Sequence, residues 1–112
     1  MGKVIAEVMF SPIGTATPSL HPYVAAALAV LEGYPGITYQ LNPMGTVLEG
    51  ERRDVINAVE AMNEAVFAAG ALRVGTTLKI DERRDKETSM EHKVEAVQDL
   101  LRGRGAAGAD RS

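Results

Sequence analysis

The sequence predicts an α+β domain in which two helices cover one face of a four-stranded antiparallel sheet. Segments with the two-residue period of strands alternate along the chain with segments that have the period of helices. Two of the strand-like segments, 37–41 and 46–49, are separated only by a short turn with Pro43 and Gly45, so they must pair antiparallel. The resulting order of strand, helix, strand, strand, helix, strand is the ferredoxin-like β-α-β-β-α-β sandwich, here followed by an extra C-terminal helix.

The first strand is expected at residues 4–11, with apolar side chains on both of its faces. One face carries Val4, Ala6, Val8 and Phe10, and the other carries Ile5, Glu7, Met9 and Ser11. A strand of this kind is usually central in its sheet or covered on both sides. Because burying a lone carboxylate is costly, Glu7 needs a partner or a ligand unless its face is open to water.

A loop rich in hydroxyl groups, residues 11–19, precedes the first helix. Thr17 or Ser19 can cap that helix, because a hydroxyl at the N-cap accepts a hydrogen bond from a free backbone N–H. Capping leaves Ser11 and Thr15 unassigned, whereas a ligand- or anion-binding loop at the helix N-terminus would use them as well. Both interpretations are open on the sequence alone.

Three helices are expected from apolar residues at helical spacing. The first covers about residues 20–33 and the second about residues 52–70, each ending at a glycine. The third begins after a capping Thr88 or Ser89. Their core-facing stripes are predicted to be Leu20, Val24, Ala27, Leu28 and Leu31; Val55, Val59, Met62 and Val66; and Met90, Val94, Val97 and Leu101.

The last strand of the sheet is expected at residues 73–81. If this strand pairs with the first one, Lys79 and Glu7 can meet on the face opposite the helices. A run of charged residues of both signs follows, which is usual for a solvated loop. Its Arg83 and Arg84 could also clamp an anion, since guanidinium groups bind anions through paired hydrogen bonds.

The composition indicates one globular domain in a cytoplasmic protein. A chain of 112 residues with 46% hydrophobic and 24% charged residues suits a single core. The net charge of -3 argues against nucleic-acid binding, and the absence of cysteine excludes disulfides and favours an intracellular location. Neither a signal peptide nor a membrane span is expected. We expect a ligand-binding domain at residues 1–102 and a disordered tail at residues 103–112.

No catalytic constellation is evident in the sequence. The two histidines, His21 and His92, share no motif with a serine or an acid, and no nucleotide-binding motif or metal-ligand spacing occurs. The sheet face opposite the helices, with Ile5, Met9 and Gly75, is too apolar to be left in water. We therefore expect a second subunit to cover this face, with the third helix as an additional contact.

Three short segments together carry a family resemblance. They are MFSPIGT at residues 9–15, PMGTVLEG at residues 43–50 and TTLKIDERRDK at residues 76–86. In this order they resemble the small thiamine-binding protein family, and the likeness extends over about residues 4–101. The resemblance implies a ferredoxin-like fold that assembles as dimers and tetramers. It also implies binding of thiamine or its hydroxymethylpyrimidine moiety, without established catalysis. We expect neither a cofactor nor a metal.

The ligand implied by this resemblance can be matched to individual side chains. An aminopyrimidine offers an amine donor and ring-nitrogen acceptors on a flat apolar body, so its pocket needs polar groups at the edge and apolar side chains on the faces. The thiazolium cation of thiamine adds the need for a counter-charge. The predicted ligand-binding residues are Ser11, Thr15, Asn42 and Thr46 at the edge, Ile13 and Met44 on the faces, and Glu7 and Glu49 as counter-charges.

Three functions are compatible with the sequence, in decreasing order of support. The first is non-catalytic binding of thiamine or hydroxymethylpyrimidine by a homo-oligomeric carrier, buffer or sensor. The second is an enzyme that acts on a small heterocycle, with Glu7 or Glu49 as the base and Lys79 assisting. The third is a regulatory or assembly module that binds an anion through Arg83 and Arg84.

Overall fold

The computed structural model describes residues 2–85 and 89–107, and it confirms the ferredoxin-like α+β fold. Its strands are β1 (Lys3–Ile13), β2 (Thr38–Asn42), β3 (Gly45–Glu51) and β4 (Arg73–Asp81). Its helices are α1 (His21–Ala29), which continues as a short 3₁₀ helix (Val30–Gly33), α2 (Arg52–Ala68) and the additional α3 (Met90–Ala107). The strands form one antiparallel sheet in the order β2-β3-β1-β4.

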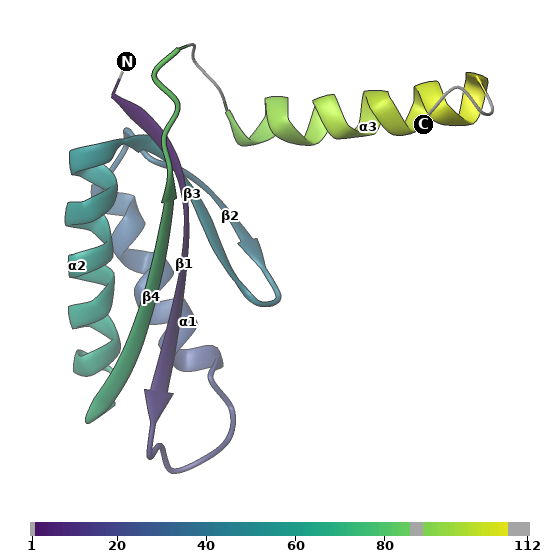
Figure 1. The fold of residues 1–112 in the computed structure, drawn as a ribbon. Coiled ribbons are helices and arrows are strands. Elements are labelled where there is room, and N and C mark those ends of the chain that lie inside the picture. Colours follow the sequence, from purple (N-terminus) through teal and green to yellow (C-terminus); the bar gives the residue numbers. More distant parts are fainter. Residues whose placement is uncertain (1, 86–88, 108–112) are drawn as a thin grey trace.

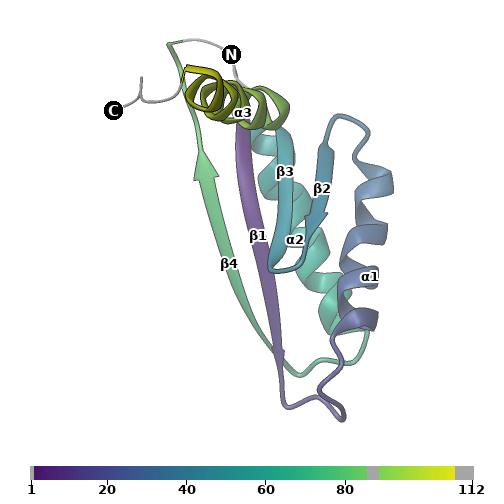
Figure 2. The ribbon, with the colours of Figure 1, turned by 90° about the vertical axis from the view of Figure 1, so that its right-hand side faces the viewer.

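The core lies between the sheet and the layer formed by α1 and α2, which cover the same face of the sheet (Figures 1 and 2). The predicted alternation of β1 is confirmed there, because Val4, Ala6 and Val8 are buried while Glu7 and Met9 are exposed. The predicted stripe of α2 is also confirmed, since all of its members are buried: Val55, Val59, Met62 and Val66. The two-residue period of the strands and the three- to four-residue period of the helices therefore determine which side chains enter the core.

The register of the sheet leaves part of β1 without a neighbour on one side. β3 pairs with β1 only as far as the Val8–Thr46 pair, whereas β4 pairs with β1 as far as Ile13. The same register places Glu7 opposite Lys79, so the predicted proximity of these two residues on neighbouring strands is confirmed. Beyond Val8, the edge of β1 that faces the β2–β3 hairpin has no described strand beside it.

Helix α3 projects from the end of β4, on the side of the sheet away from α1 and α2 (Figures 1 and 2). The N–H of Met90 donates to Glu49 Oε1 at 2.8 Å, and Lys93 forms an ion pair with Asp81. The expected cap is confirmed for Ser89, whose Oγ accepts from the N–H of His92 at 3.0 Å, while Thr88 lies outside the described residues. These contacts attach the start of α3 to the open face of the sheet.

Helix α3 is longer than the sequence suggested. It continues to Ala107, five residues past the domain boundary expected at residue 102. A glycine inside a helix costs only about 1 kcal/mol relative to alanine, so the helix can continue through both Gly103 and Gly105. Residues 108–112 of the expected tail lie outside the described residues.

The prediction that Thr17 or Ser19 caps α1 is wrong. The N-cap is Leu20, with no side-chain hydrogen bond, and the hydroxyl of Thr15 instead donates to the carbonyl of Thr17 at 2.7 Å within the loop. Pro22 in the first turn of α1 has no N–H, which removes one of the donors that a cap would satisfy. Gly14, with φ of 77°, provides the left-handed backbone that turns the chain at this point.

Candidate functional site

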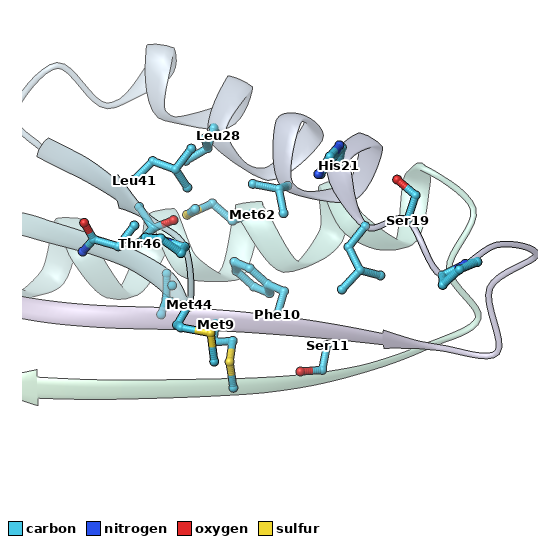
Figure 3. Close-up of a pocket in the computed structure, with 17 residues that line it drawn as sticks. Met9, Phe10, Ser11, Ser19, His21, Leu28, Leu41, Met44, Thr46 and Met62 are labelled. Atoms are coloured by element: carbon cyan, nitrogen blue, oxygen red, sulfur yellow. The ribbon is translucent and has the colours of Figure 1, made fainter.

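A cavity of about 750 Å³ lies between α1, the tip of the β2–β3 hairpin and the second half of β1 (Figure 3). We call it the hairpin cavity. It exists because the hairpin is shorter than β1, so that α1 and the unpaired edge of β1 enclose the space beyond the hairpin tip. Its apolar wall includes Phe10, Val24, Leu28, Leu41 and Met62.

The hairpin tip is a two-residue turn, Pro43-Met44, that packs closely on β1. Gly45 follows the turn with no positive φ, so its backbone conformation alone does not require glycine. The close packing on β1 favours glycine, because a Cβ at this position would lie 3.2 Å from the carbonyl oxygen of Val8 and 3.4 Å from Cγ of Glu7. This contact sets the position of the next residue, Thr46, against the cavity.

Thr46 presents a buried hydroxyl to the hairpin cavity. It is paired with Val8 across the sheet, on the helix-covered face, and is 6% exposed. No described residue forms a hydrogen bond with this hydroxyl. Figure 3 shows the side chain beside Met62 at the inner end of the cavity. Leaving a buried hydroxyl without a partner costs about 1–3 kcal/mol, so the Thr46 hydroxyl is a group to which a polar ligand or a water molecule could form a hydrogen bond.

The structure brings together half of the predicted ligand-binding residues. Ser11, Asn42, Met44 and Thr46 line the hairpin cavity, with Met44 at its mouth, where it is 79% exposed. Asn42 Oδ1 accepts a hydrogen bond from Gln40 Nε2 at 3.2 Å, which leaves the amide N–H groups of Asn42 free to act as donors. Hydroxyl, amide and apolar groups therefore meet in one cavity.

The other four predicted residues lie outside the lining of this cavity. Glu7 is exposed on the open face of the sheet, and Glu49 accepts the hydrogen bond from Met90. Thr15 bonds within its own loop, and Ile13, at the end of β1, is 46% exposed. The pleat of the sheet turns both acids, the predicted counter-charges for a thiazolium, away from the helices and from this cavity.

Several lining residues were not identified from the sequence. Ser19 and His21 lie at the start of α1, and both are exposed. His21 also borders a second, adjoining hollow of about 590 Å³ between α1 and β2. The spacing of His21, Val24 and Leu28 along one face of α1 was the available signal. Met62 is both a core residue and part of the cavity wall.

The charged pairs that follow β4 lie at the opposite end of the sheet from the hairpin cavity, since the end of β4 pairs with the start of β1. Arg83 pairs with Asp85 at 2.5 Å, and Arg84 pairs with Glu82 at 2.9 Å. The hydrogen bond with Asp85 raises the pKa of Arg83 above its usual value. Because a carboxylate already engages each guanidinium group, these arginines are poorly suited to clamp an anion.

The described part of the chain offers neither a cluster of metal ligands nor a membrane-spanning helix. Across residues 2–85 and 89–107, no three histidine or acidic side chains are grouped so that they could hold a metal ion. Among the described helices, none is long and apolar enough to cross a membrane.

Comparison with known proteins gives the family of the chain. Residues 6–98 match the family model described as thiamine-binding protein. The UPF0045 protein YqgV of Bacillus subtilis is 49% identical over 96 residues, which cover 83% of this chain and 92% of that protein. The structure resembles that of MJ1052 from Methanocaldococcus jannaschii with a TM-score of 0.80 and 39% identity, over 89% of this chain and 100% of the other.

A more distant structure supports the fold alone. It belongs to a Thermotoga maritima protein provisionally assigned to thiamine biosynthesis or salvage, with a TM-score of 0.71 at 24% identity, over 85% of this chain and 98% of that one. The segments MFSPIGT and PMGTVLEG, which carried the family resemblance, supply residues to both walls of the hairpin cavity. With most of its length matched by the family model and close relatives in the UPF0045 group, the chain belongs to the thiamine-binding protein family.

Proposed function

We propose that the protein binds thiamine or its hydroxymethylpyrimidine moiety in the hairpin cavity and acts as a non-catalytic carrier, buffer or sensor in the cytoplasm. The observation that carries this proposal is the buried, unpartnered hydroxyl of Thr46 in an otherwise largely apolar cavity. A volume of about 750 Å³ is within the usual range for small-molecule sites. Membership of the thiamine-binding protein family supports the same ligand class.

The cavity matches the chemistry of an aminopyrimidine. Leu28, Leu41 and Met62 provide apolar surface for the two faces of the ring. The hydroxyl of Thr46 can accept from the exocyclic amine or donate to a ring nitrogen, and the amide of Asn42 can donate to another acceptor. These polar groups fix the orientation of the ring, whereas apolar contact contributes most of the buried area.

The enzyme alternative has less support. Glu7 and Lys79 are neighbours across β1 and β4, but neither lines the hairpin cavity, so a substrate would have to bind on the open face of the sheet. Turnover of a small heterocycle that disappears in Glu7→Gln would favour this alternative over simple binding.

The proposal also includes a homo-oligomer, with a dimer of dimers as the expected form. Its support is the exposed apolar surface of α3 and of the open sheet face, where Val94 is 53%, Val97 is 56% and Met9 is 41% exposed. Such side chains on a projecting helix are usual at subunit contacts.

Calorimetric titration with thiamine and, separately, with hydroxymethylpyrimidine tests the proposed function. Thr46→Val should weaken binding by about 2- to 12-fold, which corresponds to one neutral hydrogen bond. The same change should leave the free energy of unfolding equal or slightly higher, because the hydroxyl has no partner in the free protein. The matched control is Thr77→Val, on the open face of β4, which should change neither quantity. Absence of binding of both compounds by a folded, ligand-free protein would refute the proposal.

A further inference from the structure

The edge of β1 beside the hairpin cavity carries backbone groups that no neighbouring strand engages. The pairing of β1 with β3 ends at the Val8–Thr46 pair. The carbonyl oxygen of Val8 points toward β3, since it lies 3.2 Å from the position that a Cβ of Gly45 would take. Backbone groups alternate between the two edges of a strand, so the N–H and the C=O of Phe10 point to this same side. Neither group has a hydrogen-bond partner among the described residues.

The hairpin cavity reaches this edge of β1. Four consecutive residues of the strand, 8–11, line the cavity. Figure 3 shows the side chain of Phe10 on one side of β1 and those of Met9 and Ser11 on the other. A cavity that touches both faces of one strand must pass around the edge of that strand. The backbone N–H and C=O of Phe10 lie at this edge, so they are accessible to a ligand in the cavity.

Pro12 limits what can bind along this edge. It lies two residues beyond Phe10 on the same side of β1 and has no backbone N–H. A proline at a strand edge prevents the continuous pairing that an added strand would need. Between Val8 and the end of β1 at Ile13, the free edge therefore offers one donor, the N–H of Phe10, beside the C=O of the same residue. Such a pair suits the edge of a small planar ring.

We propose that the backbone N–H and C=O of Phe10 bind the edge of the pyrimidine that carries the exocyclic amine. This inference rests on the proposed pyrimidine site and names the group that reads its ligand. The ring nitrogen next to the amine accepts from the N–H of Phe10, and the amine donates one hydrogen to the C=O. The buried hydroxyl of Thr46, which belongs to the last β1–β3 pair before this edge, accepts the second amine hydrogen. Thiamine and hydroxymethylpyrimidine share this edge of the ring, so the assignment applies to both.

A backbone pair discriminates between ligands in a way that the Thr46 hydroxyl does not. A backbone N–H only donates and a backbone C=O only accepts, whereas a hydroxyl can do either. If a carbonyl replaced the amine of the pyrimidine, two carbonyl oxygens would face each other and both groups of Phe10 would lose their partners. Phe10 therefore makes the site select an amine over a carbonyl at this position of the ring.

Calorimetric titration with hydroxymethylpyrimidine and with its oxo analogue, in which a carbonyl replaces the amine, tests this selection. The oxo analogue should bind at least about tenfold more weakly, because it leaves two polar groups of the protein unpaired. Thr46→Val should weaken the binding of both compounds and preserve the ratio of their dissociation constants, since a hydroxyl can pair with an amine or with a carbonyl.

Amide hydrogen exchange measured by NMR tests the backbone contact itself. Saturation with hydroxymethylpyrimidine should slow the exchange of the Phe10 N–H at least about tenfold, because this group gains a partner only in the complex. The control is the N–H of Thr76, which is opposite Phe10 in the register of β1 and β4. It points to the outer edge of the sheet, away from β1, and should exchange at the same rate with and without ligand.

The possible outcomes separate the two proposals. Equal affinities for the amine and the oxo compound, loss of the ratio in Thr46→Val, or unchanged exchange of the Phe10 N–H in the complex would each overturn the assignment to Phe10. Pyrimidine binding would still stand in all three cases. Failure of both hydroxymethylpyrimidine and thiamine to bind would overturn the pyrimidine site and, with it, the role of Phe10.

Discussion

At the residue scale, one register position accounts for the proposed ligand site. The pairing of β1 with β3 places Thr46 on the face of the sheet that carries Val8 and Leu48, where apolar residues predominate. A threonine in this position lowers the stability of the free protein, because its hydroxyl lacks a hydrogen-bond partner. A bound polar group can remove this cost. The alternation of residues 46–49 predicted a strand here, and the ligand implied by the family resemblance made Thr46 a predicted binding residue. Neither could show that its hydroxyl has no partner, since that depends on every neighbouring side chain.

The close packing of the hairpin on β1 leads to a prediction about Gly45. Gly45→Ala should lower the free energy of unfolding by about 1–3 kcal/mol, because the new Cβ would press on the backbone of Val8 and the side chain of Glu7. Urea denaturation followed by circular dichroism measures the change. The control is Gly33→Ala, where nothing lies within 4 Å of the new Cβ, and this variant should be neutral or slightly more stable. Equal effects of the two substitutions would contradict the role assigned to Gly45.

At the element scale, the sequence was informative about strands and helices and less so about their ends. The alternation in β1 and the helical stripe of α2 have a period set by backbone geometry, so the buried faces could be predicted from the sequence. The extent to which β1 runs past the hairpin depends on loop lengths and packing, which no periodic pattern records. Met9 and Ser11 belong to the open face of the sheet. They nevertheless line the hairpin cavity, because the cavity reaches around the unpaired edge of β1.

The attachment of α3 to β4 leads to a prediction about Asp81. The hydrogen bond from Lys93, together with the charge of its ammonium group, lowers the pKa of Asp81 below its ordinary value. The stability provided by this pair is therefore present above the pKa of the unfolded chain and is lost as the pH falls through the lower folded value. Lys93→Gln should raise the pKa of Asp81 toward its ordinary value, as measured by a carboxyl NMR titration. Lys93→Arg should keep the pKa low, and an identical titration curve in Lys93→Gln would disprove the contact.

At the scale of the whole molecule, the single chain is more extended than a compact domain of its length. Its radius of gyration is 17.1 Å, whereas a compact chain of this size would have about 13 Å. Helix α3 accounts for the difference, because it projects from the open face of the sheet and packs on no other described helix (Figure 1). The amphipathic pattern of α3 was visible in the sequence, but a single chain does not reveal the surface that its apolar stripe covers.

The last prediction concerns the assembly that would cover this stripe. Val94, Val97 and Leu101 lie on one side of α3 and are each more than half exposed, at 53%, 56% and 59%. Replacing Val94 and Leu101 together by glutamate should convert the oligomer to smaller species, because each carboxylate would lose its hydration at the subunit contact. Size-exclusion chromatography with light scattering measures the mass, and His92→Glu, on the opposite side of the helix, is the matched control. A monomeric unsubstituted protein, or an unchanged mass in the double variant, would mean that α3 makes no contact between subunits. The exposed stripe would then require a different partner.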